Sequence, residues 1–119
     1  MNPELSESVI GAAYEVQNIL GPGFLEKVYE NALLVELARR GLRVDAQKQL
    51  KVKYKDAIVG DYVADLTVDD KVIVELKADN AYSKQHEAQL LNYLKATGLK
   101  VGVLINFGRT KCEFKRLVM

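Results

Sequence analysis

The chain has 119 residues, 49% of them apolar, which is enough for one hydrophobic core and too few for two ordinary domains. Its 17 basic and 16 acidic residues nearly cancel, which excludes a protein that attracts nucleic acid through a strong overall positive charge. We therefore expect residues 1–119 to form a single domain, and any nucleic-acid contact to come from a local basic patch.

Two helices are predicted at the start of the chain, because apolar residues recur there at three- and four-residue steps. The first helix runs from about Glu4 to Leu20 and is ended by Gly21-Pro22-Gly23. The second runs from about Phe24 to Arg40, with Gly41 as its stop. Two helices joined by a tight loop therefore open the domain.

Residues 42–76 are rich in β-branched and aromatic residues, in runs that are broken at Lys55-Asp56, Gly60 and Asp69-Asp70. This pattern predicts a meander of three or four strands. The composition is typical of a sheet that packs against helices.

The last third of the chain predicts one more helix and two strands. Ser83 is placed to cap a helix that reaches about Thr97, and residues 100–106 and 111–118 are predicted to be closing strands. The fold class is therefore an α/β sandwich with a central mixed sheet. Basic residues gather towards this end, so we expect the basic surface there; they are Arg109, Lys111, Lys115 and Arg116, against Glu113 alone.

Neither secretion nor membrane insertion is expected. No apolar run approaches the ~20 residues needed to span a bilayer, and the first residues lack the basic start of a secretion signal. Cys112 is the only cysteine, so no internal disulfide can form, and a cytoplasmic location fits. No base lies near Cys112 in sequence, which favours a small buried residue over a nucleophile.

Three ionisable residues, Asp65, Glu75 and Lys77, interrupt two strands that are otherwise aliphatic. Side chains alternate along a strand, so Glu75 and Lys77 lie on one face and Leu76 on the other. Whether Asp65 joins them depends on the register of the hairpin.

Two registers compete for this hairpin. A two-residue Asp69-Asp70 turn pairs Ala64 with Glu75 and puts Asp65 on the aliphatic face. A three-residue loop, 69–71, pairs Asp65 with Glu75 and leaves one face wholly apolar, so we favour it. That apolar face, which we expect to pack against a helix, comprises Ala64, Leu66, Val68, Val72, Val74 and Leu76.

Opposed carboxylates on neighbouring strands repel each other unless a cation lies between them, and oxygen ligands suit Mg²⁺ or Mn²⁺. The backbone carbonyl of Leu76 can add a ligand. Lys77 can orient an attacking water or neutralise charge on a phosphate. The alternative is that Lys77 simply pairs with Asp65 or Glu75 at a solvated sheet edge.

Three motifs together resemble the PD-(D/E)XK nuclease superfamily, over about residues 5–118. Asp65, nine residues and Glu75-Leu76-Lys77 are similar to its metal-binding hairpin, although Ala64 replaces the proline of the superfamily's name. Residues 23–29, Gly-Phe-Leu-Glu-Lys-Val-Tyr, resemble the signature of its GxxExxY branch. Residues 89–93, Gln-Leu-Leu-Asn-Tyr, resemble the QxxxY element of RecB-like exonucleases.

The resemblance implies a restriction-endonuclease-like fold and metal-dependent hydrolysis of phosphodiester bonds in DNA or RNA, with DNA the favoured substrate. It implies that Glu26 is an additional acid at the metal site, although an acid in the first turn of a helix is also favourable to the helix dipole. Gln89 and Tyr93, four residues apart on one helix face, are expected to position a water, Lys77 or a phosphate.

The face of the third helix that carries Gln89 and Tyr93 is expected to border the metal site, because the leucines must cover the sheet. Those leucines are Leu90, Leu91 and Leu94. Glu30 is expected to be a solvated surface acid. His86 lacks a second His or a nearby Cys, so a zinc site is not expected.

Two other functions compete with a nuclease. One is a non-catalytic nucleic-acid-binding or assembly protein that retains the fold, and the other is a structural module with an ordinary ion pair. The intact Asp65, Glu75 and Lys77 set favours the nuclease. Because the chain has little net charge and no separate DNA-binding domain, a homodimer or a partner protein is expected to help hold the substrate.

Overall fold

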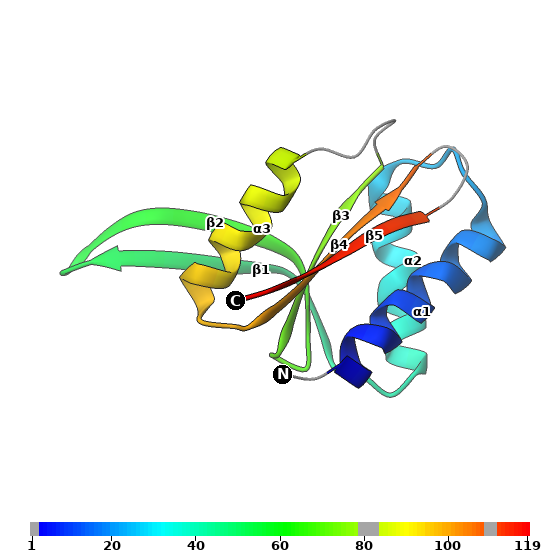
Figure 1. The fold of residues 1–119 in the computed structure, drawn as a ribbon, viewed down its shortest axis with the longest axis horizontal. Helices are drawn as coiled ribbons and strands as arrows, with labels where there is room; N and C mark the ends of the chain where they lie inside the picture. Colours follow the sequence, from blue (N-terminus) through cyan, green and yellow to red (C-terminus); the bar gives the residue numbers. More distant parts are fainter. Residues whose placement is uncertain (1–2, 79–83, 109–111) are drawn as a thin grey trace.

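The computed structural model describes residues 3–78, 84–108 and 112–119, and it has the predicted α/β architecture on a mixed sheet. The helices and strands, drawn in Figure 1, are α1 (Pro3–Leu20), α2 (Glu26–Arg39), β1 (Val44–Tyr54), β2 (Ala57–Val68), β3 (Val72–Lys77), α3 (Lys84–Thr97), β4 (Val101–Phe107) and β5 (Cys112–Val118). The predicted cap Ser83 and the basic residues Arg109 and Lys111 lie outside the described residues.

The strand meander has three strands, because β2 continues through Gly60, where the sequence indicated a break. Gly60 pairs with Val52, and a Cβ at Gly60 would lie 3.3 Å from the Val52 Cβ. The glycine therefore makes room for a close neighbour inside the strand pair. The register shifts just beyond it, between Val52 and Lys53.

The sheet has the order β1-β2-β3-β4-β5. Only β3 and β4 are parallel, and the chain crosses between them through α3. The remaining neighbours are antiparallel. This is the mixed sheet that the sequence predicted, with two helices before the central hairpin and one after it.

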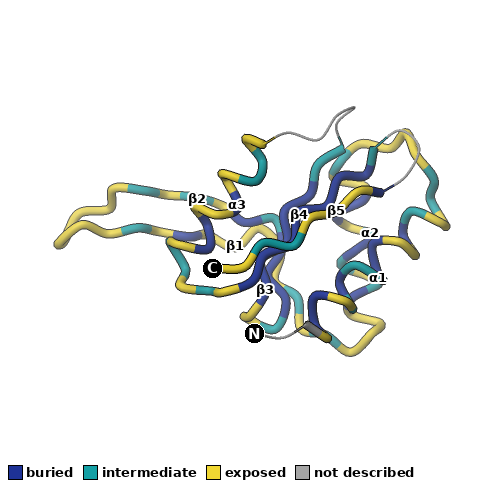
Figure 2. The backbone as a smooth tube through the Cα atoms, in the orientation of Figure 1, coloured by how far each residue is buried: buried dark blue, intermediate teal, exposed yellow. Residues whose placement is uncertain are grey.

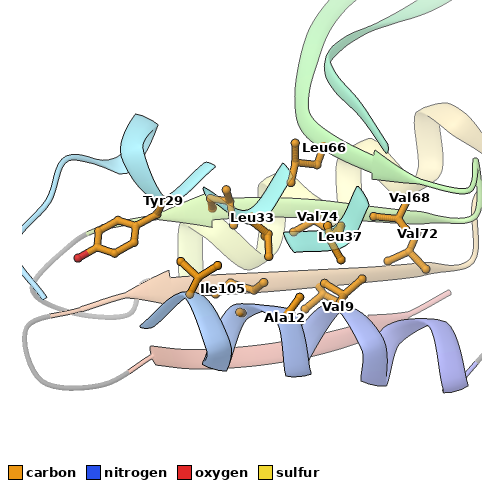
Figure 3. Close-up of a cluster of buried hydrophobic side chains, with 14 of the residues drawn as sticks. Val9, Ala12, Tyr29, Leu33, Leu37, Leu66, Val68, Val72, Val74 and Ile105 are labelled. Carbon is orange, nitrogen blue, oxygen red and sulfur yellow. The ribbon is translucent and has the colours of Figure 1, made fainter. Parts of the chain in front are cut away.

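The first core lies between the sheet and the two N-terminal helices. Figure 3 shows Val9 and Ala12 of α1 and Tyr29, Leu33 and Leu37 of α2 facing apolar residues of the strands. The residues of β2, β3 and β4 in this core include Leu66, Val68, Val72, Val74, Leu76, Val103 and Ile105. Burial of this continuous apolar face supplies most of the driving force for folding.

The second core lies on the opposite face of the sheet, under α3. Leu90, Tyr93 and Leu94 of the helix pack with Ile73 and Leu104 of the strands. The approach is close: a Cβ on Gly102 of β4 would lie 2.9 Å from the Leu90 side chain. The absence of a side chain at residue 102 therefore lets α3 sit directly on β4.

The outer parts of β1 and β2 project beyond the rest of the sheet as a two-stranded ribbon (Figure 1), which we call the arm and define as residues 48–63. The arm is mostly exposed in Figure 2. Near its base Leu50 is buried and belongs to the second core.

Cys112 is buried at the start of β5 and is a free thiol. Burial, and secondarily the charge of Glu113, raises the pKa of Cys112 to about 11, so the thiolate is disfavoured at neutral pH. Within the described part of the chain, no helix is long and apolar enough to cross a membrane.

The contact between Gly102 and Leu90 generates a prediction about stability. We expect Gly102→Ala to destabilise the protein by about 1–3 kcal/mol, because Leu90 is fully buried and cannot swing away. The matched control is Gly11→Ala in α1, where the new methyl group would meet only the end of the Arg40 side chain, at 3.1 Å. Gly11→Ala should be neutral or stabilising by up to about 1 kcal/mol. Urea unfolding of both variants measures the difference, and equal effects would contradict this packing.

Candidate metal centre

The central hairpin adopts the three-residue loop. Leu66, Thr67 and Val68 of β2 pair with Val74, Ile73 and Val72 of β3, the register that places Asp65 beside Glu75. The turn is built by Asp69 and Asp70, which both have positive φ angles, and by a hydrogen bond from the Lys71 N–H to the Val68 carbonyl. The prediction of the register is confirmed.

Asp65 and Glu75 each bind the backbone of the other's strand. The Asp65 N–H donates to Glu75 Oε1 at 3.0 Å, and the Leu76 N–H donates to Asp65 Oδ2 at 2.8 Å. These reciprocal bonds hold both carboxylates beside the hairpin. They also offset part of the repulsion between the two carboxylates, since a carboxylate is stabilised by hydrogen bonds from backbone N–H groups.

One residue of the predicted apolar face lies elsewhere. Ala64 belongs to the second core, with Leu90 and Tyr93 of α3, whereas Leu66 belongs to the first. Strict alternation of side chains along β2 would place Ala64 and Leu66 on the same face of the sheet. The change coincides with Gln47, which lies between the β1 residues paired with Leu66 and Ala64 and has a φ of 54°, a conformation that disrupts regular pleating.

Glu75 is nearly completely buried, at 3% exposure. Desolvation, followed by the charge of Asp65, raises the pKa of Glu75 to about 8, against the lowering effects of the Asp65 N–H and Lys77. The pKa of Asp65 is also raised, mainly by burial, and the charge of Lys77 again opposes the shift. Lys77 therefore lies close enough to act on both acids, and it does not fully compensate them.

Glu30 is buried, so the expectation that it is a solvated surface acid was wrong. Its carboxylate accepts hydrogen bonds from Lys27 Nζ at 2.7 Å and from Gln47 Nε2 at 2.9 Å. Its charge contributes to the raised pKa of Asp65. A sequence signal existed: Glu26, Glu30 and Leu33 follow one another at helical spacing on the stripe that faces the core.

The GxxExxY segment has a physical role in shaping the loop before α2. The Tyr29 hydroxyl donates to the Gly21 carbonyl at 2.6 Å and accepts from the Phe24 N–H at 3.2 Å. Its ring stacks on Phe107 of β4, with the ring centroids 4.5 Å apart. Tyr29 thereby ties the start of α2 to the sheet. Glu26, the first residue of α2, lies close enough to contribute to the raised pKa of Glu75.

The third helix places Tyr93 on the side of the two acids. Tyr93 is buried, and its pKa is raised first by burial and then by the charges of Glu75 and Asp65, while a hydrogen bond from Gln89 opposes the rise. Its ring lies 5.4 Å from that of Tyr62 on the arm. The prediction for Leu91 was wrong, since this side chain is 40% exposed and only Leu90 and Leu94 cover the sheet.

The donor set at this site fits a small divalent cation. Among the described residues no group of three or more His, Cys, Asp or Glu side chains is close enough to hold a metal. Mg²⁺, however, is commonly bound through one or two carboxylates, with waters and substrate phosphates as the other ligands. Asp65 and Glu75 supply such a pair. The side chain of Leu76 is in the first core, so only its backbone is available as a ligand.

Comparison with known proteins agrees with this geometry. The family model described as the PD-(D/E)XK nuclease superfamily matches residues 3–117. The chain belongs to the PD-(D/E)XK nuclease superfamily. No curated protein matches the chain.

Two solved structures share the superfamily fold with this chain. The crystal structure of SSO0001 is 16% identical, with a TM-score of 0.64, and covers 98% of this chain. The alkaline exonuclease LHK-Exo from Laribacter hongkongensis is 14% identical, with a TM-score of 0.57, and covers 99%. The chain spans 58% of the length of SSO0001 and 72% of that of LHK-Exo. At these identities the likeness shows the fold.

The repulsion between the two acids predicts that their neutralisation stabilises the metal-free protein. We expect Glu75→Gln to raise the free energy of unfolding in EDTA by on the order of 1 kcal/mol or more at pH 8, and Asp65→Asn to raise it as well. Millimolar Mn²⁺ should raise the melting temperature of the wild type and have less effect on both variants. Asp61→Asn, at an exposed acid of the arm, is the control and should change little. The opposite result would be that both variants melt below the wild type in EDTA and that Mn²⁺ shifts none of the melting temperatures. That result would show that Lys77 forms an ordinary ion pair with Asp65 or Glu75.

The raised pKa of Glu75 predicts a pH dependence of stability. The folded state keeps a proton on Glu75 up to about pH 8, whereas the unfolded chain loses it near the ordinary value of 4.5. The stabilising contribution is therefore complete below pH 4.5 and is lost as the pH rises through about 8. In this range the stability of the metal-free wild type should fall relative to that of Glu75→Gln, by at most about 1.4 kcal/mol per pH unit. Urea unfolding at several pH values tests this, and parallel curves for the two proteins would contradict it.

Proposed function

We propose that this protein is a nuclease that hydrolyses phosphodiester bonds with the help of Mg²⁺ or Mn²⁺. The observation that carries the proposal is the Asp65–Glu75 pair, in which Glu75 is buried and Asp65 is half-buried. Each carboxylate accepts a hydrogen bond from the opposite strand, and the charge of Lys77 lowers the pKa of both. Membership of the nuclease superfamily supports the same reading. A structural ion pair has no need for two acids that repel each other inside the protein.

Asp65, Glu75 and the Leu76 carbonyl would hold the cation, and Glu26, the additional acid, would add negative charge beside it. When bound, the cation supplies positive charge at the phosphate and lowers the pKa of a bound water. The Lys77 ammonium is a hydrogen-bond donor for the attacking water and a positive charge for the scissile phosphate. Lys77 is thus the residue for which a structural role is hardest to argue.

Other residues of the site position these groups. Glu30 and Gln47 link α2 to the strand opposite Asp65, so they fix the distance between the helix and the hairpin. Tyr93, with Gln89 beside it on α3, borders the acids and provides a phenol that can orient a water or a phosphate.

We assign the protein to the GxxExxY branch, with a QxxxY element on α3. The role of Tyr29 in the loop before Glu26 supports the first part, because it explains why a tyrosine follows the glutamate at that spacing. The hydrogen bond between Gln89 and Tyr93 supports the second. We further propose a cytoplasmic enzyme that acts on DNA, with a second copy or a partner protein contributing to substrate binding.

We expect Lys77→Met to lower metal-dependent cleavage by at least about 100-fold, because it removes a charged donor at the reacting phosphate. The substitution keeps most of the apolar stem of the side chain. Lys71→Met, at an exposed lysine of the same hairpin, is the matched control and should retain activity. Cleavage is measured on single- and double-stranded DNA and RNA with Mg²⁺, Mn²⁺ or EDTA.

A stability measurement separates lost chemistry from lost structure. Lys77→Met should keep a Mn²⁺-dependent rise in melting temperature, since it leaves both carboxylates in place. Cleavage that persists in EDTA, or that is unaffected by both Lys77→Met and Glu75→Gln, would refute the proposed function. Binding of nucleic acid without any cleavage would favour the non-catalytic alternative.

A further inference from the structure

The arm carries the most basic segment of the chain. Residues 46–55 read Ala-Gln-Lys-Gln-Leu-Lys-Val-Lys-Tyr-Lys, with four lysines and no acid. In the C-terminal cluster expected from the sequence, the two described residues already have partners: Lys115 pairs with Glu87 at 3.2 Å, and the Arg116 Nε donates to the Ser6 Oγ at 3.1 Å. Among the described residues, the arm is therefore the better candidate for the local basic patch.

The base of the arm is part of the candidate metal centre. Gln47 precedes the first residue of the arm and donates to Glu30 at the site. Asp65, an acid of the central pair, comes two residues after the last residue of the arm. A polymer bound with one phosphate at Asp65 and Glu75 would thus meet the arm directly.

The arm has two different faces. One face is occupied near its base by the second core, where Leu50, Ala64 and Tyr62 pack with α3. The other face carries Lys51 and Lys53, which are two residues apart and so ~6.6 Å apart along the strand. Both lysines are exposed, and within the described part of the chain neither forms an ion pair.

The other charged residues of the arm either interact with a neighbouring group or are acids that reduce its positive charge. Lys48 pairs with Asp70 at 3.1 Å, and Lys55 lies over the Tyr54 ring, 5.5 Å from its centroid. Asp61 lies opposite Lys51 on the partner strand, and Asp56 is in the turn. Four lysines against two acids leave the arm positive, with Lys51 and Lys53 as its most available charges.

We propose that the face of the arm bearing Lys51 and Lys53 binds the phosphate backbone of duplex DNA that extends from the metal centre. This inference rests on the proposed function, because the metal centre defines where the duplex begins. A two-stranded β-ribbon has a width that a DNA major groove accepts, and duplex DNA carries one phosphate charge per ~1.7 Å of its axis, about twice the density of one strand. The outer arm has only two strands, and such a ribbon gains order from a surface that it lies against.

The test compares two variants with the same loss of charge. Lys51→Gln/Lys53→Gln removes the proposed contacts, and Lys71→Gln/Lys100→Gln removes two exposed lysines that are not on the arm. Binding of a fluorescently labelled DNA duplex is measured by anisotropy in EDTA, which prevents metal-dependent cleavage, over a range of salt concentrations. Thermal melts verify that both variants are folded, and Lys51→Arg/Lys53→Arg tests whether charge alone restores binding.

We expect the arm variant to bind the duplex about 10-fold more weakly than the wild type, with a salt dependence reduced by about 2 in the slope of log K against log salt. The control variant and the arginine variant should bind like the wild type. Equal affinities of the arm and control variants, equal losses in both, or no binding of duplex by the wild type would overturn the inference. Tighter binding of single-stranded DNA or RNA would also overturn it.

The competing partner for the arm is a second copy of the chain. The apolar residues Ile58 and Val59 near the tip of the arm are more than half exposed and could be covered by such a copy. Sedimentation of the wild type and of Ile58→Asp/Val59→Asp addresses it. Dimerisation that this variant abolishes, with DNA binding that Lys51→Gln/Lys53→Gln leaves unchanged, would assign the arm to self-association. Failure of this inference and failure of the proposed function are distinguishable. Cleavage by Lys77→Met, with unchanged binding, tests the chemistry, and duplex binding by the arm variant in EDTA tests the arm.

Discussion

The structure depends on the reciprocal hydrogen bonding of Asp65 and Glu75. Each carboxylate accepts a hydrogen bond from a backbone N–H of the other's strand, so the two acids are held side by side although they repel each other. The Asp65 N–H donates to the Glu75 side chain at the point where β2 stops pairing with β3 and continues towards the arm. The two hydrogen bonds therefore position both acids at the place where the arm leaves the rest of the sheet.

The layers on both faces of the sheet add to the negative potential at this point. Glu26 and Glu30 come from α2, while Tyr93 from α3 helps to exclude water. Lys77 offsets only part of the effect of burial and of the charge of Asp65, so the pKa of Glu75 remains raised. Lys27 and Gln47 donate hydrogen bonds to Glu30. Such a site favours a cation or a proton, because either one removes the repulsion without requiring the side chains to move. The two apolar cores supply the stability that offsets this local cost.

The shape of the molecule follows from covering a five-stranded sheet with only three helices. Helices α1 and α2 cover one face and α3 the other, and the outer ends of β1 and β2 are left as an exposed ribbon. In this way four of the twelve lysines of a chain with nearly balanced charge lie on one projecting element. The candidate metal centre lies at the base of that element, next to these lysines.

The helices, the mixed sheet and the register of the hairpin could be predicted from the sequence, because each depends on local periodicity or on an apolar face that only one pairing preserves. It did not predict that Ala64 and Leu66 lie in different cores, since the conformation of Gln47 that accompanies this change depends on contacts with α2. Burial of Glu30 and exposure of Leu91 were also decided by the tertiary structure. A charged side chain is buried only where partners satisfy it. Lys27 on the same helix is one partner of Glu30, and the other is Gln47, which only the tertiary structure brings there from a strand that comes after the helix.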